Sequence, residues 1–374
     1  MKRYLPHSIG LAVMFATLAY GLTQRFWFNW VFWTMFVVSL GLGSLFIVAI
    51  GHLLGARWTI PMRRVPERTA SLVLLAAALL IFGLFGLTSI YPWTQPAQDL
   101  SHIVADKTPW LNVPFFAIRT LLCIAAWVAS YKMFTGLSLQ QDASADPRLT
   151  LRMRRYAPAF LALFAVTLTV IAFDWISSLE PEWYSDIFGV YFFAGLFLAA
   201  LAFTTLGVLR LKDQGRLPGV TGDHLHNLGV LMFAFTVFWS YIAFAQYMLI
   251  WYGNLPEEIV WYQQRIGGPW NAVVAILVLS RFIIPFFALA TYDAKHDVTR
   301  LRWVSWTILA GHAVDLYWLI MPSFSDTPAL SWPEAGAALF FIALIVSWTA
   351  SASRMGADMP TGDPFIKAGL DYKQ

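Results

Sequence analysis

Five ionisable side chains lie inside long apolar stretches of this 374-residue chain. They are Arg119, Asp174, Arg281, His312 and Asp315. Ionisable groups in such stretches mark either a functional site or a buried ion pair. The two arginines match the two aspartates in charge, and His312 and Asp315, three residues apart, share a helix face. A carboxylate and a histidine on one face can relay protons, because histidine titrates near neutral pH.

Two interpretations of these residues stay open at this point. The arginines and aspartates could form buried pairs that fix helix register. Alternatively, all five residues could form a polar cluster that carries protons between the midplane and the outer face, or that lines a pocket for a quinone headgroup. Pro285 adds a local expectation, because a proline removes the hydrogen bond to the carbonyl four residues earlier, here that of Arg281. We expect this face of the helix to turn into the protein, where a free backbone group is tolerated.

The composition excludes several classes of protein. The chain is 59% apolar and 12% charged, and its mean hydropathy is +0.62, whereas soluble domains are about 45–50% apolar and about 25% charged. A soluble enzyme, a disordered chain and a nucleic-acid-binding domain are therefore not expected. With the single cysteine Cys123 and one deep histidine, we expect no disulfide framework, metal site, iron–sulfur cluster or bis-histidine haem within the chain.

The apolar stretches predict an all-α integral membrane protein. A helix needs roughly 20 apolar residues to cross the bilayer core. Ten stretches qualify as spans of a single polytopic domain over residues 1–374, and the first of them is short. They lie at about 8–22, 30–54, 69–90, 112–134, 156–178, 187–209, 227–251, 270–291, 303–321 and 334–353.

The basic residues predict that both termini are cytoplasmic. Nineteen of the lysines and arginines, including Lys2 and Arg3, lie at the two termini and in alternate loops between the spans. The other set of loops holds only Arg25, Lys107 and Arg265. Such an asymmetry places the richly basic side inside. The predicted outer side is acidic, and its acids are Asp99, Asp106, Glu180, Glu182, Asp186, Glu257, Glu258, Asp326 and Glu334.

Polar residues at span ends supply candidate entry and exit groups for protons. On the predicted outer side, Glu180, Glu182 and Asp186 could pass protons outward from a deeper donor. On the predicted inner side, a candidate mouth of a half-channel is formed by His52, Tyr292, Asp293 and His296. The alternative for the inner set is that these residues are solvated span ends.

Two segments of the chain together resemble a known family. The first contains Phe173-Asp174-Trp175, then Ser-Leu-Glu-Pro-Glu-Trp-Tyr-Ser over residues 178–185 and Ile-Phe-Gly-Val-Tyr-Phe-Phe-Ala-Gly over residues 187–195. The second runs from His226-Asn227-Leu228-Gly229 to Gln-Tyr-Met-Leu-Ile-Trp-Tyr over residues 246–252. They resemble the ActF-type subunits of bacterial alternative complex III, which are NrfD/PsrC-like membrane proteins. The resemblance implies ten spans, arranged as two four-helix bundles plus two further helices. The Pro-Gly-Trp-His run of the related ActC-type subunits is missing.

The resemblance implies a role in a respiratory quinol:cytochrome c oxidoreductase, or one with another periplasmic acceptor, in the bacterial cytoplasmic membrane. The chain would be a subunit without a redox cofactor of its own, with quinone or menaquinone as its candidate ligand. Implied partners are a second NrfD-like subunit, an iron–sulfur subunit, multihaem and monohaem cytochrome c subunits, a cytochrome oxidase in a supercomplex, and lipids. A purely structural anchor and a stand-alone proton-coupled transporter are the alternatives.

Overall fold

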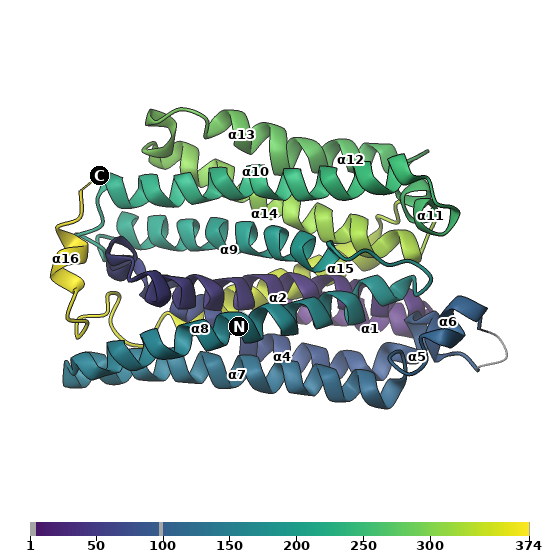
Figure 1. Cartoon of the computed structure of the whole chain (residues 1–374), viewed down its shortest axis with the longest axis horizontal. Coiled ribbons are helices and arrows are strands. Elements are labelled where there is room, and N and C mark those ends of the chain that lie inside the picture. Colours follow the sequence, from purple (N-terminus) through teal and green to yellow (C-terminus); the bar gives the residue numbers. More distant parts are fainter. Residues whose placement is uncertain (1–4, 97–99, 374) are drawn as a thin grey trace.

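The structure, a computed structural model, describes residues 5–96 and 100–373. Within these ranges, every regular element is helical. Lys2, Arg3 and Asp99, which enter the charge analysis above, lie outside the described residues. Consecutive long helices run back and forth along one axis (Figure 1).

Nine helical segments in the described ranges are long and apolar enough to cross a membrane. They are α2 (Thr23–Leu54), α3–α5 (Arg64–Ile90), α7 (Val113–Ser144), α8 with η5 (Pro147–Leu179), α9 (Phe188–Asp213), α10 (Gly222–Gly253), α12–α13 (Trp270–Ala288), α14 with η8 (Val298–Ser323) and α15 (Trp332–Ala352). Within them, α4 is Leu72–Gly83, α8 ends at Trp175, α14 ends at Ile320, and the π-helical segment η6 (Leu279–Ile283) joins α12 to α13. The chain is therefore a multi-pass, all-helical membrane protein.

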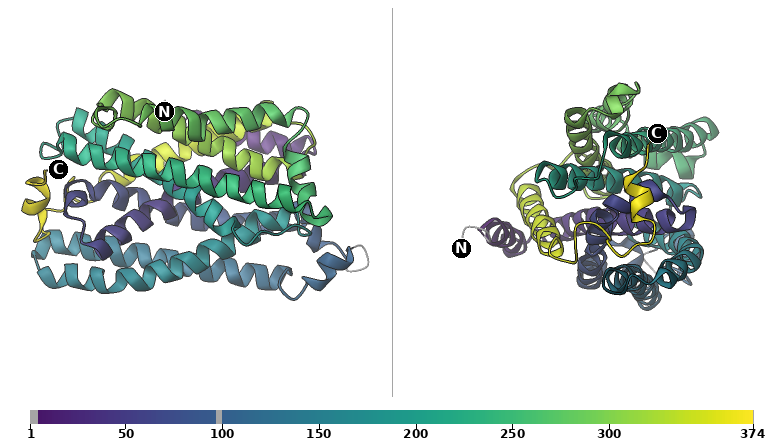
Figure 2. Two further views of the ribbon diagram at one scale, coloured as in Figure 1. Left: turned by 45° about the horizontal axis from the view of Figure 1, so that its top comes forward. Right: turned by 90° about the vertical axis from the view of Figure 1, so that its left-hand side faces the viewer.

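The first expected span is shorter than a full crossing. Residues 8–22 were expected to form it, but the helix is α1 (Leu5–Ala19), with 15 residues. At 1.5 Å per residue it is about 22 Å long, less than the roughly 30 Å of a hydrocarbon core. It lies beside α15 at the edge of the molecule (Figure 2). Glycine allows this close approach, since a Cβ on Gly10 would come within 2.5 Å of the backbone nitrogen of Phe340.

Several helices extend beyond the apolar stretches that predicted them. The stretch at 112–134 became α7, which runs to Ser144, and the stretch at 156–178 became α8, which begins at Pro147. Side chains cap the helix starts, where backbone N–H groups have no partner inside the helix. Asn112 accepts a hydrogen bond from the N–H of Phe115 at 2.9 Å, and Asp146 accepts one from Arg148 at 2.8 Å. Hydropathy therefore locates the membrane core of each helix but misses its polar ends.

Two groups of helices meet along α2 and α9. In the first group, α2 packs against α4 and α8, and α7 packs against α4 and α8. In the second, α9 packs against α10 and α14, and α14 also contacts α12 and α13. The contact between α2 and α9 joins the groups, while the pair of α1 and α15 lies at one side (Figure 2).

The loops divide between two ends of the bundle. The short elements are η1 (Arg57–Met62), η3 (Pro92–Thr94), α6 (His102–Asp106), α11 (Pro256–Arg265), η7 (Asp293–Lys295) and α16 (Ile366–Leu370). α16 lies at one end and α6 and α11 at the other (Figure 1). We call the first the basic end, because it carries the clusters 57–68, 148–155 and 210–216. The opposite end, which carries Glu180, Glu182 and Asp186, is the acidic end.

The C-terminal segment 353–373 is held against the basic end by ion pairs. Asp358 contacts Arg68 Nη1 at 2.9 Å and Arg216 Nη2 at 2.6 Å, and Asp363 contacts Arg63 Nη1 at 2.7 Å. Arg63, Arg68 and Arg216, which lie in loops between the predicted spans, are therefore partly neutralised by acids of the same chain.

A buried charge network lies directly beneath this segment. Arg64 is fully buried and contacts Glu67 Oε2 at 2.7 Å, while its other terminal nitrogen pairs with Asp142. Glu67 also accepts from Arg63 Nε at 3.1 Å. The network joins the start of α3 to α7 and to the C-terminal segment, because Arg63 reaches both Glu67 and Asp363.

The Asp358 contacts predict a pH-dependent clamp. Asp358→Asn should lower the free energy of unfolding by roughly 1–2 kcal/mol, because two charge-assisted contacts are lost. Burial raises the pKa of Asp358, but hydrogen bonds from Arg68 and Arg216 outweigh it and leave the pKa below its usual value. The stabilisation is therefore present above about pH 4 and is lost as the pH falls through the lower pKa of the folded protein.

Thermal unfolding in detergent at several pH values measures this contribution. Asp371→Asn is the matched control, because Asp371 is an exposed residue of the same segment. Equal unfolding temperatures for the two variants at pH 7 would show that Asp358 does not hold the segment.

Candidate functional site

The first buried ion pair joins α7 to α8 near the acidic end. Arg119 donates from Nε to Asp174 Oδ2 at 2.7 Å and from Nη2 to Oδ1 at 2.9 Å. Its Nη1 donates to the carbonyl of Trp110 at 2.9 Å, and the Trp110 indole donates to Asp174 at 3.1 Å. The guanidinium also lies 4.1 Å from the Trp110 ring. This pair is bidentate and each of its three guanidinium nitrogens has a partner, as expected of a structural ion pair.

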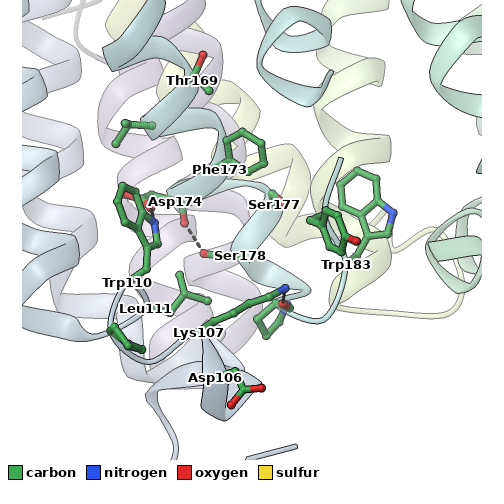
Figure 3. Close-up of a pocket in the computed structure, with 14 residues that line it drawn as sticks. Asp106, Lys107, Trp110, Leu111, Thr169, Phe173, Asp174, Ser177, Ser178 and Trp183 are labelled. Atoms are coloured by element: carbon green, nitrogen blue, oxygen red, sulfur yellow. Dashed lines mark hydrogen bonds between the residues drawn. The ribbon is translucent and has the colours of Figure 1, made fainter. Parts of the chain in front are cut away.

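A cavity of about 600 Å³ opens beside Asp174. Figure 3 shows Trp110, Phe173 and Trp183 around it, with Lys107 reaching across its lower side. The Lys107 ammonium donates to the carbonyl of Pro181 at 2.5 Å, and burial lowers the pKa of Lys107. We call this space the Asp174 cavity. Its residues are Asp106, Lys107, Pro109, Trp110, Leu111, Thr169, Val170, Phe173, Asp174, Ser177, Ser178, Pro181, Trp183 and Tyr184.

The second buried pair lies in the other group of helices. Arg281 belongs to the π-helical segment η6, four residues before Pro285, and it is fully buried. Its Nη2 lies 3.4 Å from Asp315 Oδ2 on α14. π-Helical turns inside α-helices occur frequently at functional sites. The expectation that this face turns inward is confirmed, since Arg281 has no exposed surface.

Asp315 receives its hydrogen bonds from two other helices. Tyr191 on α9 donates to Oδ1 at 2.5 Å, and the Trp239 indole on α10 donates to Oδ2 at 3.1 Å. The Arg281 guanidinium lies 4.7 Å from the Trp239 ring centre. We call Tyr191, Trp239, Arg281, His312 and Asp315 the Asp315 centre.

The nitrogens of the Asp315 centre are poorly satisfied by protein groups. Among the described residues, none makes a hydrogen bond to the three guanidinium nitrogens of Arg281 or to either ring nitrogen of His312. Both side chains are essentially fully buried. Buried polar groups of this kind are where ordered water is found in proteins. The centre is therefore suited to hold water beside a carboxylate and an imidazole.

Two glycines leave room for this arrangement. A Cβ on Gly195 of α9 would lie 3.0 Å from Arg281 Nη2 and 3.3 Å from Asp315 Oδ2. A Cβ on Gly311 of α14 would lie 2.9 Å from Arg281 Cδ. Larger residues would crowd the charged groups, so both glycines fit the role of spacers.

The five deep residues therefore form two sites. Arg119 and Asp174 make their contacts between α7, α8 and Trp110, whereas Asp315 contacts Arg281 and side chains of α9 and α10. His312 lies one turn before Asp315 on α14, with its ring centre 5.6 Å from that of Phe36 on α2. Tyr191, Trp239 and Gly195 went unassigned in the sequence analysis. Tyr191 and Gly195 lie within the first motif segment and Trp239 lies within the second, which is the signal that could have drawn attention to them.

The candidate outer residues have unlike environments. Glu180 pairs with Arg265 Nη2 at 2.7 Å and accepts from Ser323 Oγ at 2.6 Å, whereas Glu182 and Asp186 are exposed. Burial lowers the pKa of Arg265, and Glu180 opposes this change. Arg265 Nη2 also donates to the carbonyl of Leu319, so Glu180 lies at the end of the helix that carries Asp315.

The candidate inner residues fall into two places. His52 is buried on α2 and stacks on Phe134 of α7, with ring centres 5.8 Å apart. His296 instead stacks on His226 with ring centres 4.4 Å apart, and the Tyr292 ring lies tilted against His226 at 4.6 Å. Asp293 is exposed at the start of η7. The four residues therefore do not line one mouth.

Comparison with known proteins adds no family to this description. No protein-family model matches the chain, and no curated protein matches it. The fold and the two sites define a multi-pass, all-helical membrane protein with two buried arginine–aspartate pairs.

The geometry of the first pair predicts a stability effect. Asp174→Asn should cost about 3–5 kcal/mol, because it leaves the Arg119 charge buried without a counter-ion. Replacing both residues with leucine should recover part of the loss, since no charge then remains buried. Thermal unfolding of the purified protein measures both. Asp186→Asn, at an exposed acid, is the matched control, and an equal loss there would refute the structural role of the pair.

Proposed function

We propose that the chain is a membrane subunit of a bacterial quinol:electron acceptor oxidoreductase of the alternative complex III type. In this role it anchors the complex in the cytoplasmic membrane and conducts protons through the Asp315 centre. The resemblance of the two motif segments to ActF-type subunits supports the proposal. The helix contacts agree with it: α2, α4, α7 and α8 make one four-helix group, and α9, α10, α12–α13 and α14 make another.

The observation that carries the proton-conducting role is that His312 and Arg281 are buried with side-chain nitrogens that lack hydrogen-bond partners among the described residues. Both lie beside Asp315. Water held there can exchange protons with the imidazole and the carboxylate, the residue types used for proton relay. A purely structural pair has no need of a neighbouring histidine, and the Arg119–Asp174 pair indeed has none among its contacts.

The route outward follows α14. Leu319, whose carbonyl accepts from Arg265, is four residues beyond Asp315, or about 6 Å along the helix. Ser323 and Glu180 follow at its end. Protons released from the Asp315 centre would therefore reach Glu180 first and the exposed Glu182 and Asp186 afterwards.

The route from the basic end has candidate stations on α9 and α10. The hydroxyls of Thr204 and Thr236 are buried and have no hydrogen-bond partner among the described residues. Thr204 also lines a cavity of about 360 Å³ that reaches Arg63 near the basic end. Thr236 lies one turn from Trp239, so these hydroxyls extend from the cavity toward the Asp315 centre.

Replacement of the titratable groups tests the proton route. Asp315→Asn and His312→Gln should each lower proton release and quinol:acceptor activity by roughly tenfold or more, because proton transfer by a placed side chain contributes at least that much. The assay uses the purified complex in proteoliposomes, with a pH-sensitive dye and a reduced quinol analogue. The matched control is Asp326→Asn, at an exposed acid of the acidic end.

Assembly separates this proposal from its rivals. The proposal requires the chain to co-purify with haem c and iron–sulfur subunits, whereas a transporter purifies alone. If the complex assembles with Asp315→Asn and with His312→Gln and keeps full proton release and activity, the proton-conducting role is wrong. The chain would then serve only as a membrane anchor.

A second candidate role is quinone binding in the Asp174 cavity. Four aromatic rings line the cavity beside the polar Asp174 and Lys107, those of Trp110, Phe173, Trp183 and Tyr184. Flat aromatic walls with few polar groups are typical of sites for small apolar ligands. Val170 and Phe173 line it and are only half-buried, so a ligand could enter from the bilayer.

Filling the cavity tests the second role. Val170→Phe should raise the KM for quinol, or weaken labelling by a photoreactive quinone, by about tenfold, because the added ring occupies the entrance. Val166→Phe is the matched control, since Val166 lies one turn away on the same helix and outside the cavity. Unchanged labelling in Val170→Phe would place the quinone elsewhere.

A further inference from the structure

Three arginines on α8 differ from most cations of the basic end. Arg148, Arg152 and Arg155 are exposed, and they form no ion pair with a described residue. Their spacing of four and three residues places them on one helix face. The nearest acids along the chain are engaged, since Asp142 pairs with Arg64 and Asp146 caps α8 at the N–H of Arg148. The charge of the three arginines is therefore uncompensated within the described chain.

The same face of α8 continues as an apolar stripe. Ala159, Leu163 and Val166 follow Arg155 at helical spacing, and the side chains of Leu163 and Val166 are 39% and 63% exposed. The opposite face is buried against the bundle through Met153, Phe160 and Phe164. From Arg155 to Val166 the stripe covers about 16 Å, close to half of the roughly 30 Å hydrocarbon core. The three cations can contact the negatively charged phosphate groups of phospholipids. The apolar stripe beyond them is about as deep as one leaflet and can contact the acyl chains.

We propose that Arg148, Arg152 and Arg155 bind the phosphate groups of anionic phospholipids in the leaflet at the basic end. The arginines contact the headgroups, and Ala159, Leu163 and Val166 contact the acyl chains. Arginine binds phosphate through paired N–H donors, which suits it to this contact better than a point charge would. Arg155 is the deepest of the three, and its long side chain reaches back toward the headgroups.

Other basic residues of this end do not offer the same surface. Arg63, Arg64 and Arg68 are buried and paired with acids, and Arg300 and Arg302 lie next to Asp297 and Asp213. Exposed cations such as Arg210, Arg354 and Lys367 come from separate elements. The lipid site is thus specific to α8 and does not follow from the number of basic residues alone.

Native mass spectrometry of the full-length protein tests the site. The protein is equilibrated with vesicles of phosphatidylcholine and phosphatidylglycerol, and the lipids retained after detergent extraction are counted. Each arginine near an anionic surface strengthens attraction by roughly fivefold. Replacing all three with glutamine (R148Q/R152Q/R155Q) should therefore lower the preference for phosphatidylglycerol on the order of a hundredfold. Replacement with lysine should retain most of it, because the charge remains.

A matched variant and a stability measurement make the test decisive. R210Q/R354Q/K367Q removes the same charge from exposed positions outside the α8 face and should keep the lipid preference within about threefold. The unfolding temperature of R148Q/R152Q/R155Q in pure phosphatidylcholine should equal that of the unchanged protein, since these side chains have no ionic partner to lose. Equal loss in the two glutamine variants overturns the proposal. So does a wild-type protein without preference for phosphatidylglycerol, the result expected if a protein partner covers this face.

Discussion

The cost of placing charge inside an apolar bundle governs this structure. A buried ion is stable only with a counter-ion and further hydrogen bonds. The chain meets this requirement with pairs that join different helical segments: Arg25–Glu334, Arg119–Asp174, Arg265–Glu180 and Arg281–Asp315. Each pair links segments that are distant in sequence, and a helix shifted by one residue would separate the partners. Charge pairing thereby sets the register that apolar contacts alone specify weakly.

The two deep pairs place identical residue types in different environments. Around Arg119, a bidentate aspartate and a backbone carbonyl give each guanidinium nitrogen a hydrogen-bond partner, and two aromatic rings lie against it. Around Arg281, the aspartate instead takes its bonds from Tyr191 and Trp239, and the guanidinium is left at 3.4 Å. A polar group that is incompletely satisfied at low dielectric is expensive to maintain. Retention of such a group beside His312 is more readily explained by chemistry than by stability.

Apolar runs predict most of the fold because a bilayer demands helices of a narrow length range. Pro285 likewise predicted that Arg281 faces inward. The partners of Asp315 could not be predicted, because Tyr191 and Trp239 come from helices more than 70 residues away in sequence. Arg64 and Glu67 fall between the expected spans 30–54 and 69–90, because their charges lower the local hydropathy, although both are fully buried. The bounds of α1 differ by three residues from those expected, because composition does not show where a short apolar helix begins and ends.

The basic end combines two physical roles that a count of lysines and arginines cannot separate. In the sequence, Arg63, Arg64 and Arg68 and the α8 arginines count alike toward the prediction that the basic end is cytoplasmic. In the folded protein, Asp142, Asp358 and Asp363 neutralise the first group. What remains exposed on α8 is a smaller, aligned set of cations. Acids of the same chain thus hold Arg63, Arg64 and Arg68 in an internal clamp, and the exposed α8 arginines remain as the surface that we propose contacts lipid headgroups.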